Sequence, residues 1–300
     1  MKKLSFRFWL NLLIYVAIIF LIVVLIRFDF VKLKNISINP YWAALALIVL
    51  FISYLVSPMA WKVILSKHKI KISYREAYVA EGMPIFAKYL PGKFMVLIGR
   101  AGFVSLKGHP LTQTSVISFK SQMISLISNL LFGSVSFLFI NHIRVVMLPW
   151  MALLTIIIVI LYVKPVYHFT IRLIHKIFKS KAPIPYLALS ESLMVFIWYI
   201  VLDILWGLGF MLLCLSAGIE ISLVFIPVFS LATSVSIMAF LFPGGLGVRE
   251  GVLVYFLYKW GIPVEQATIA ALLSRLWFLS GEIYFFSSAF ILKKITKTLE

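Results

Sequence analysis

Six long apolar runs decide what this chain can fold into, because each needs surroundings that exclude water. They cover residues 8–26, 41–61, 115–140, 145–163, 192–215 and 267–292. A helix of about 20 residues rises ~30 Å, which matches the hydrocarbon thickness of a bilayer. The hydrophobic share of 63% also exceeds the roughly half-apolar composition of soluble proteins. We therefore expect an all-α polytopic membrane protein, with about six full transmembrane helices in a single integral membrane domain over residues 1–300.

Two further apolar segments, at 77–105 and 222–260, are each interrupted by Pro-Gly and followed by an arginine. The first reads Leu90-Pro91-Gly92-Lys93 and continues to Arg100, and the second reads Phe242-Pro243-Gly244-Gly245 and continues to Arg249. Such a break frees backbone groups that lipid cannot hydrogen-bond, so the backbone must line a polar cavity or be buried in protein. We predict two Pro-Gly-broken re-entrant hairpins with a substrate site between them.

The order of these segments recurs along the chain. In each half, two full spans are followed by a broken hairpin and a third span. Three crossings separate the halves, so the second half is expected to be inverted relative to the first. We predict an inverted repeat with halves 1–142 and 143–300. The alternative is coincidence, since proline and glycine are common in membrane helices.

Basic loop residues orient the chain, because loop lysines and arginines are retained on the cytoplasmic side. Most of them fall at Lys107 and in the segments 2–7, 62–75, 164–181 and 293–297, while the opposite side receives Arg27, Lys32, Lys34, Arg144 and Lys259. We expect a multi-pass protein of the cytoplasmic (plasma) membrane with both termini in the cytoplasm. The first run is expected to be a retained anchor, because no small-residue cleavage site follows it.

Ten charged residues remain at membrane depth once the loops are set aside. They are Lys88, Lys93, Arg100, Lys120, Arg249, Arg275, Glu81, Asp203, Glu250 and Glu282. Each costs a few kcal/mol in hydrocarbon, so each must face protein, water or a ligand. Cations outnumber acids in this set, which favours an anionic guest such as a phosphate or phosphodiester.

The two breaks carry the chemistry of an anion site. Helix N-termini that begin after the breaks aim unpaired N–H groups at an anion, and Gly244 and Gly245 permit close backbone approach. Lys93, Arg100 and Arg249 are predicted to bind phosphate oxygens. Glu250, directly after the second break, is assigned to the same head-group site.

Four other charges are predicted to support this site or couple it to an ion. Glu282, together with Glu250, is expected to orient the cations, and Glu81 and Arg275 are supporting charges. Asp203 is either a proton-coupling carboxylate or the partner of Arg275 or Lys120. A purely structural alternative remains open, in which Arg249 pairs with Glu282 or Asp203, and Arg100 pairs with Glu81, only to hold the hairpins.

The sequences around both breaks resemble those of the lysylphosphatidylglycerol synthase transmembrane-region family, whose members are also called flippase-like membrane proteins. The resemblance rests on Tyr89-Leu90-Pro91-Gly92-Lys93 with Gly99-Arg100, and on Phe242-Pro243-Gly244-Gly245-Leu246-Gly247-Val248-Arg249-Glu250. It implies a bundle with re-entrant elements that handles a lipid with a charged head group. In two-part members a cytosolic domain transfers an aminoacyl group from tRNA to phosphatidylglycerol, and the membrane part moves lipid across the bilayer.

Two departures limit what the resemblance implies. Only a short tail to Glu300 follows the last span, so we expect no soluble aminoacyltransferase domain and no aminoacyl transfer. Some relatives carry an acid soon after the first Pro-Gly, where this chain has Phe94, Met95 and Val96. No role for such an acid is carried over.

The first functional hypothesis is a translocase for an anionic phospholipid or a polyprenyl-phosphate-linked precursor. The alternatives are an intramembrane lipid-linked transferase, or a non-catalytic membrane partner of a glycosyltransferase or lipid-modifying enzyme. No ATP-binding loop is present, and the single Cys214 and scattered histidines predict no metal site, so no cofactor is expected. The net charge of +18 lies largely beside the spans, where it attracts anionic lipid rather than nucleic acid.

Overall fold

The computed structural model describes residues 37–89, 94–139, 189–238 and 247–299, together with residues 165, 168, 169 and 172. Within these ranges the chain is helical and contains no strand. Four of the helices are long and apolar enough to cross a membrane. The predicted all-α polytopic membrane fold is therefore confirmed.

The four long helices coincide with four of the predicted spans. They are α2 (Pro40–Lys67), α5 (Leu111–Ser134, continued by the 3₁₀ turn η3, Val135–Phe139), α8 (Leu189–Ser216) and α11 (Val264–Leu299). The side chain of Asn39 caps α2 by accepting a hydrogen bond from Tyr41 N, and Pro40 occupies the first helical position, where its missing N–H costs nothing. The two other predicted spans, 8–26 and 145–163, lie outside the described residues.

Each interrupted segment folds as a set of short helices. The first gives α3 (Tyr74–Gly82), the 3₁₀ turn η2 (Ile85–Tyr89) and α4 (Phe94–Ser105); the second gives the 3₁₀ turn η4 (Leu223–Phe225), α9 (Ile226–Met238) and α10 (Val248–Lys259). The four α-helices have 9 to 13 residues, so each rises only about 14 to 20 Å and is too short to cross a bilayer alone. The Pro-Gly positions themselves, including Lys93, Gly244 and Gly245, lie outside the described residues, and re-entry from the membrane surface stays a prediction.

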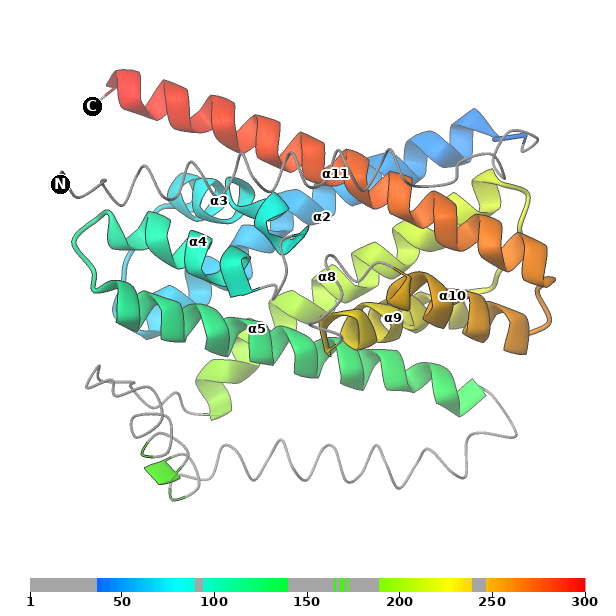
Figure 1. The fold of residues 1–300 in the computed structure, drawn as a ribbon, viewed down its shortest axis with the longest axis horizontal. Helices are drawn as coiled ribbons and strands as arrows, with labels where there is room; N and C mark the ends of the chain where they lie inside the picture. Colours follow the sequence, from blue (N-terminus) through cyan, green and yellow to red (C-terminus); the bar gives the residue numbers. More distant parts are fainter. Residues whose placement is uncertain are drawn as a thin grey trace, which may run out of the picture.

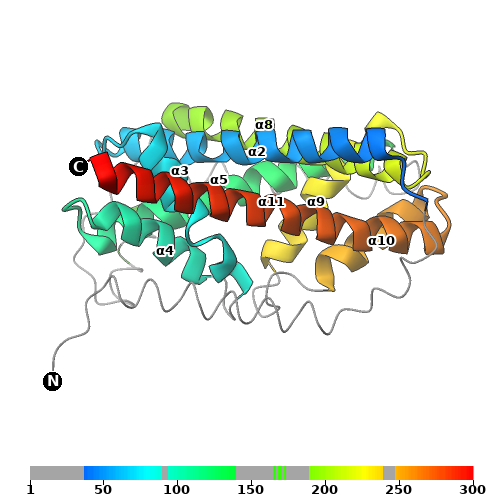
Figure 2. The same ribbon diagram turned by 90° about the horizontal axis from the view of Figure 1, so that it is seen from above.

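The two sets of short helices lie at opposite ends of the bundle. In Figure 1, α3 and α4 lie at the end where α11 finishes, and α9 and α10 lie at the end where α11 begins; Figure 2 shows the same arrangement from above. Both α4 and α10 begin near the middle of the bundle and run outward (Figure 1). The residues that follow the two breaks are thereby directed to the same central region.

The described helices pack in corresponding pairs. The first long helix of one half, α2, packs along its counterpart α8; α5 contacts α9 while α11 contacts α3; and α4 lies on α5 as α10 lies on α11. Such matched contacts are what two halves related by a twofold axis produce. The inverted repeat with halves 1–142 and 143–300 stays a prediction.

A glycine sets the distance between α5 and α9. A Cβ added at Gly133 would lie 2.7 Å from the backbone nitrogen of Leu231 and 2.8 Å from its Cα. Only a residue without a side chain allows this approach, which is the usual way that membrane helices pack closely. The contact fixes α9, and with it one wall of the central region.

We expect Gly133→Val to destabilise the protein by about 1 to 3 kcal/mol, because the new side chain forces apart two backbones that cannot yield. Thermal unfolding of the detergent-solubilised protein measures the effect. Gly251→Ala is the matched control, since a Cβ at that helical position meets nothing within 4 Å and alanine favours the helix. Equal unfolding temperatures for the two variants would contradict the packing argument.

Candidate functional site

A cavity of about 510 Å³ occupies the central region. Residues from α2, α3, η2, α4, α5, α8, α9, α10 and α11 line it, so both sets of short helices contribute. Its volume falls within the range of small-molecule sites. Four cations line it (Lys88, Arg100, Arg249 and Arg275), together with the carboxylates of Glu81 and Glu282.

Residues of the first half bind all three guanidinium nitrogens of Arg100. Its Nη1 donates to Glu81 Oε1 at 3.0 Å, its Nε donates to Ser118 Oγ at 2.7 Å and its Nη2 donates to Ser118 O at 2.6 Å. Glu81 also accepts a hydrogen bond from Ser57 at 2.8 Å, and the guanidinium lies 4.4 Å from the centre of the Trp61 ring. These contacts tie α4 to α2, α3 and α5.

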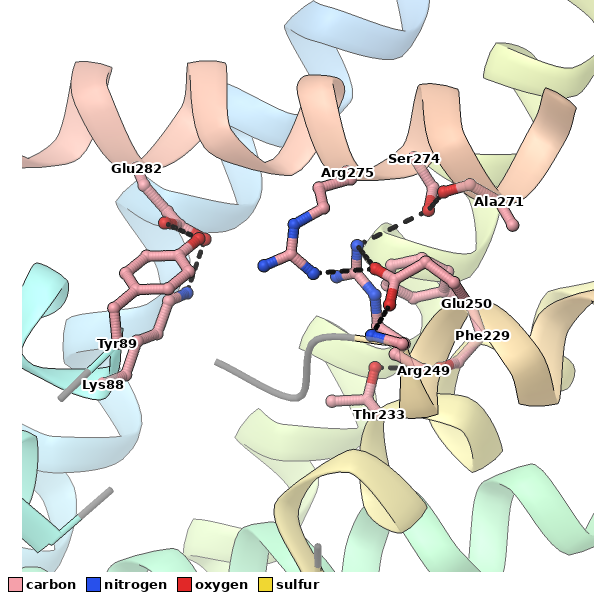
Figure 3. A network of polar contacts seen from close by, with 11 residues as sticks. Lys88, Tyr89, Phe229, Thr233, Arg249, Glu250, Ala271, Ser274, Arg275 and Glu282 are labelled. Atoms are coloured by element: carbon pink, nitrogen blue, oxygen red, sulfur yellow. Dashed lines mark hydrogen bonds and ion pairs between the residues drawn. The ribbon is translucent and has the colours of Figure 1, made fainter. Parts of the chain in front are cut away.

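Glu250 organises the start of α10. Its Oε2 accepts a hydrogen bond from Gly247 N at 2.9 Å, and Gly247 has a φ of 79°, a conformation that glycine adopts without strain. Its Oε1 accepts a hydrogen bond from Arg275 Nη1 at 2.9 Å. One carboxylate thus caps a short helix and joins it to α11, as Figure 3 shows.

Arg249 is held more loosely than Arg100. Its Nη2 lies 3.6 Å from Glu250 Oε1 and donates to Ser274 Oγ at 3.5 Å. Its guanidinium lies 5.5 Å and 5.1 Å from the ring centres of Phe229 and Phe278, a position that cation–π attraction favours. Its Nε is buried and has no hydrogen-bond partner among the described residues.

Glu282 joins the first set of short helices to α11. It accepts hydrogen bonds from Lys88 Nζ at 2.5 Å and from Tyr89 Oη at 2.8 Å. In Figure 3, Arg275 points from α11 toward Glu250, while Glu282 on the same helix points toward Lys88 and Tyr89. Arg275 and Glu282 stand seven residues apart on one helix face, so a single helix contacts both sets.

Most of the predicted site residues meet at this cavity. Arg100, Arg249, Glu81, Arg275 and Glu282 line it, and Glu250 binds two of the arginines from beside it. Lys93, Gly244 and Gly245 lie outside the described residues. The cavity therefore collects predicted residues from both halves of the chain.

The predicted ion-pair partners require correction. The pair of Arg100 with Glu81 is present, but Arg249 contacts Glu250 rather than Glu282 or Asp203. Arg275 likewise binds Glu250 rather than Asp203. Asp203 accepts a hydrogen bond from Ser128 at 2.6 Å and is not among the residues that line the cavity. The capping geometry explains these differences, because Glu250 sits where both arginines reach it.

Sequence reasoning missed several lining residues. Lys88 was recognised as an intramembrane charge but not assigned to the site, and its partner Glu282 is 194 residues away in the chain. Tyr89 and the uncharged Gln122 and Asn129 were not singled out. The position of Lys88, three residues before Pro91, is the one signal that links it to the break.

The described residues form an all-helical bundle with four helices long and apolar enough to cross a membrane, and the bundle contains a cavity lined by charged side chains. These features define a polytopic membrane protein with an internal polar site. The chain belongs to the family described as the lysylphosphatidylglycerol synthase TM region, whose model matches residues 8–279. This family membership supports a membrane role related to lipids. No curated protein and no solved structure gives a significant match.

We expect Glu250→Gln to destabilise the protein by about 3 kcal/mol, because it leaves two buried arginines without their carboxylate. Adding Arg275→Gln should recover part of the loss, and the difference measures the coupling between the two residues. Thermal unfolding of the single and double variants gives these values. Glu265→Gln, at an exposed acid in the first turn of α11, is the control and should change stability by less than about 0.5 kcal/mol. Strictly additive effects would show that the pair is uncoupled.

Proposed function

We propose that the protein is a lipid translocase whose cavity binds the anionic head group of a phospholipid or of a polyprenyl-phosphate-linked precursor. The observation that carries the proposal is a central cavity that four cations line among the described residues, and that short helices from opposite ends of the bundle help to form. Family membership supplies the link to lipids. The partners on this proposal are membrane lipids.

The charge balance supports an anionic head group. Among the described residues of the site, four cations are balanced by Glu81 and Glu282 in the lining and Glu250 beside it, so one positive charge is left over. A phosphate that binds here supplies the missing negative charge and accepts hydrogen bonds from the cations. Buried charge that is not compensated is costly, and the anion offsets that cost.

The contacts assign different roles to the two arginines. Arg100 uses all three guanidinium nitrogens to bind Glu81 and Ser118, which suits an anchor for the first set of short helices. Arg249 makes two long contacts and keeps a buried Nε that has no hydrogen-bond partner among the described residues. We therefore assign Arg249 the main contact with phosphate. Lys88 is the second candidate, because it lines the cavity and is bound to Glu282 alone among the described carboxylates.

The opposed short helices suit movement of the head group between the two leaflets. If α3 and α4 open toward one surface while α9 and α10 close the other, the cavity faces each side in turn. Asp203 is the candidate for ion coupling, since it is 1% exposed and accepts a hydrogen bond from a hydroxyl. The expected setting is the cytoplasmic membrane with both termini in the cytoplasm.

Translocation is favoured over an intramembrane transferase. A transferase needs a carboxylate that is available as a base, whereas Glu81, Glu250 and Glu282 each bind a cation in the cavity wall. A membrane partner of a glycosyltransferase is the other alternative. It predicts that changes in the cavity leave function intact.

Vesicles reconstituted with the protein test the proposal directly. Fluorescent phosphatidylglycerol and a polyprenyl phosphate are the anionic probes, phosphatidylcholine is the zwitterionic one, and bleaching by an impermeant reductant reports movement between leaflets. We expect faster movement of at least one anionic probe than in empty vesicles. Arg249→Gln should slow it by roughly tenfold or more, which is the effect of losing one charge-assisted hydrogen bond.

Lys259→Gln is the matched control, because it removes an exposed cation from the far end of the same helix. Thermal unfolding of each variant separates a loss of transport from a loss of fold. Movement no faster than in empty vesicles for every probe would overturn the proposal. Equal rates for the wild type and Arg249→Gln would overturn the assigned contact.

A further inference from the structure

The cavity holds a second polar atom that needs a partner, and it is an acceptor rather than a donor. Asn129 on α5 is 1% exposed and lines the cavity. Its Nδ2 donates to Ser125 O at 2.7 Å and to Ser125 Oγ at 3.3 Å. Its Oδ1 is buried and accepts no hydrogen bond among the described residues.

The same face of α5 presents further uncharged polar groups to the cavity. Gln122, Ser125 and Asn129 all line it, and their spacing of three and four residues places them on one side of the helix. Thr233 lines it from α9, the helix that packs against α5. This wall is neutral and rich in hydrogen-bonding groups, whereas the wall formed by α10 and α11 is charged.

Two buried groups without partners therefore line one cavity, and their chemistry is complementary. Arg249 Nε is a donor and needs an acceptor such as a phosphate oxygen; Asn129 Oδ1 is an acceptor and needs a donor. A buried polar atom left without a partner costs about 1 to 3 kcal/mol, so each one favours a ligand that satisfies it. A single ligand that satisfies both carries a phosphate and a hydrogen-bond donor.

We propose that Asn129 is a specificity-determining residue, which accepts a hydrogen bond from a hydroxyl group of the lipid head group. The site then selects phosphodiester lipids with a hydroxylated head group, such as glycerol or a sugar, over those whose head group has no hydroxyl. This inference rests on the proposed function, because it concerns the same cavity. A hydroxyl is favoured over an ammonium group as the donor, since the cations that line the cavity outnumber its acids.

Native mass spectrometry of the purified protein with added lipid tests the inference. The two probes are phosphatidylglycerol and phosphatidylmethanol, which carry the same single negative charge and differ in the hydroxyls of the head group. We expect the wild type to prefer phosphatidylglycerol by roughly fivefold, the effect of one neutral hydrogen bond. Asn129→Leu should abolish this preference and leave binding of phosphatidylmethanol unchanged.

Arg249→Gln should weaken the binding of both probes equally, which separates the phosphate contact from the hydroxyl contact. Phosphatidylethanolamine is the third probe, and binding as tight as that of phosphatidylglycerol would overturn the choice of hydroxyl over ammonium. If Asn129→Leu fails to fold, Asn129→Ala gives the same comparison, because it also removes the acceptor.

Each remaining outcome is decisive. Equal binding of phosphatidylglycerol and phosphatidylmethanol by the wild type would overturn the role of Asn129 and leave the anion site intact. If Asn129→Leu weakens the binding of both probes equally, the residue has a structural role instead of a role in specificity. If the wild type binds neither probe nor a polyprenyl phosphate, the proposed function fails together with this inference.

Discussion

A charge buried at membrane depth needs a partner, because lipid hydrocarbon cannot stabilise the charge and bulk water is excluded. In this protein α11 supplies the charged partners for both sets of short helices. Glu282 binds Lys88 and Tyr89 from the first set, and Arg275 binds Glu250 from the second. The two sets approach from opposite ends (Figure 1), and one helix face links them. A shift of α11 relative to either set would break an ion pair, so the position of each set is coupled to that of the other.

Each half contains an arginine–serine contact between a short helix and a long one, and the contact is shorter in the first half than in the second. In each half an arginine on the outward-running short helix donates to a serine of the next long helix: Arg100 to Ser118, and Arg249 to Ser274. The first arginine is fully bound and the second is loosely held. On the predicted repeat, the two arginines occupy corresponding positions, and on the proposed function the unused hydrogen-bonding capacity of Arg249 serves the ligand.

Much of the fold follows from sequence, and less of the site does. Apolar length sets the spans, so α2, α5 with its continuation η3, α8 and α11 match the predicted runs to within a few residues, except that α2 and α11 extend six and seven residues further at their C-terminal ends. Pro-Gly predicts where helices stop, and short helices flank both breaks. The pair of Arg100 and Glu81 was foreseen only within the structural alternative, and it is present. The partners considered for Arg275 and Glu282 were wrong, because hydropathy says which charges are buried but not which of them face one another across helices.

On the proposed function, the charged residues of the cavity must both bind an anionic head group and release it. Cations at α10 and α11 draw in an anion, but a cavity that only attracted phosphate would hold it and slow its release. Catalysed movement needs a site that binds the head group well enough to replace its water and weakly enough to let it go. On the proposed function, carboxylates that already bind the cations meet this need, since Glu250 and Glu282 would compete with phosphate for Arg249, Arg275 and Lys88. Each acid would bind its cation again as the phosphate leaves, so the ion pairs that hold the short helices in place would also set the affinity of the site.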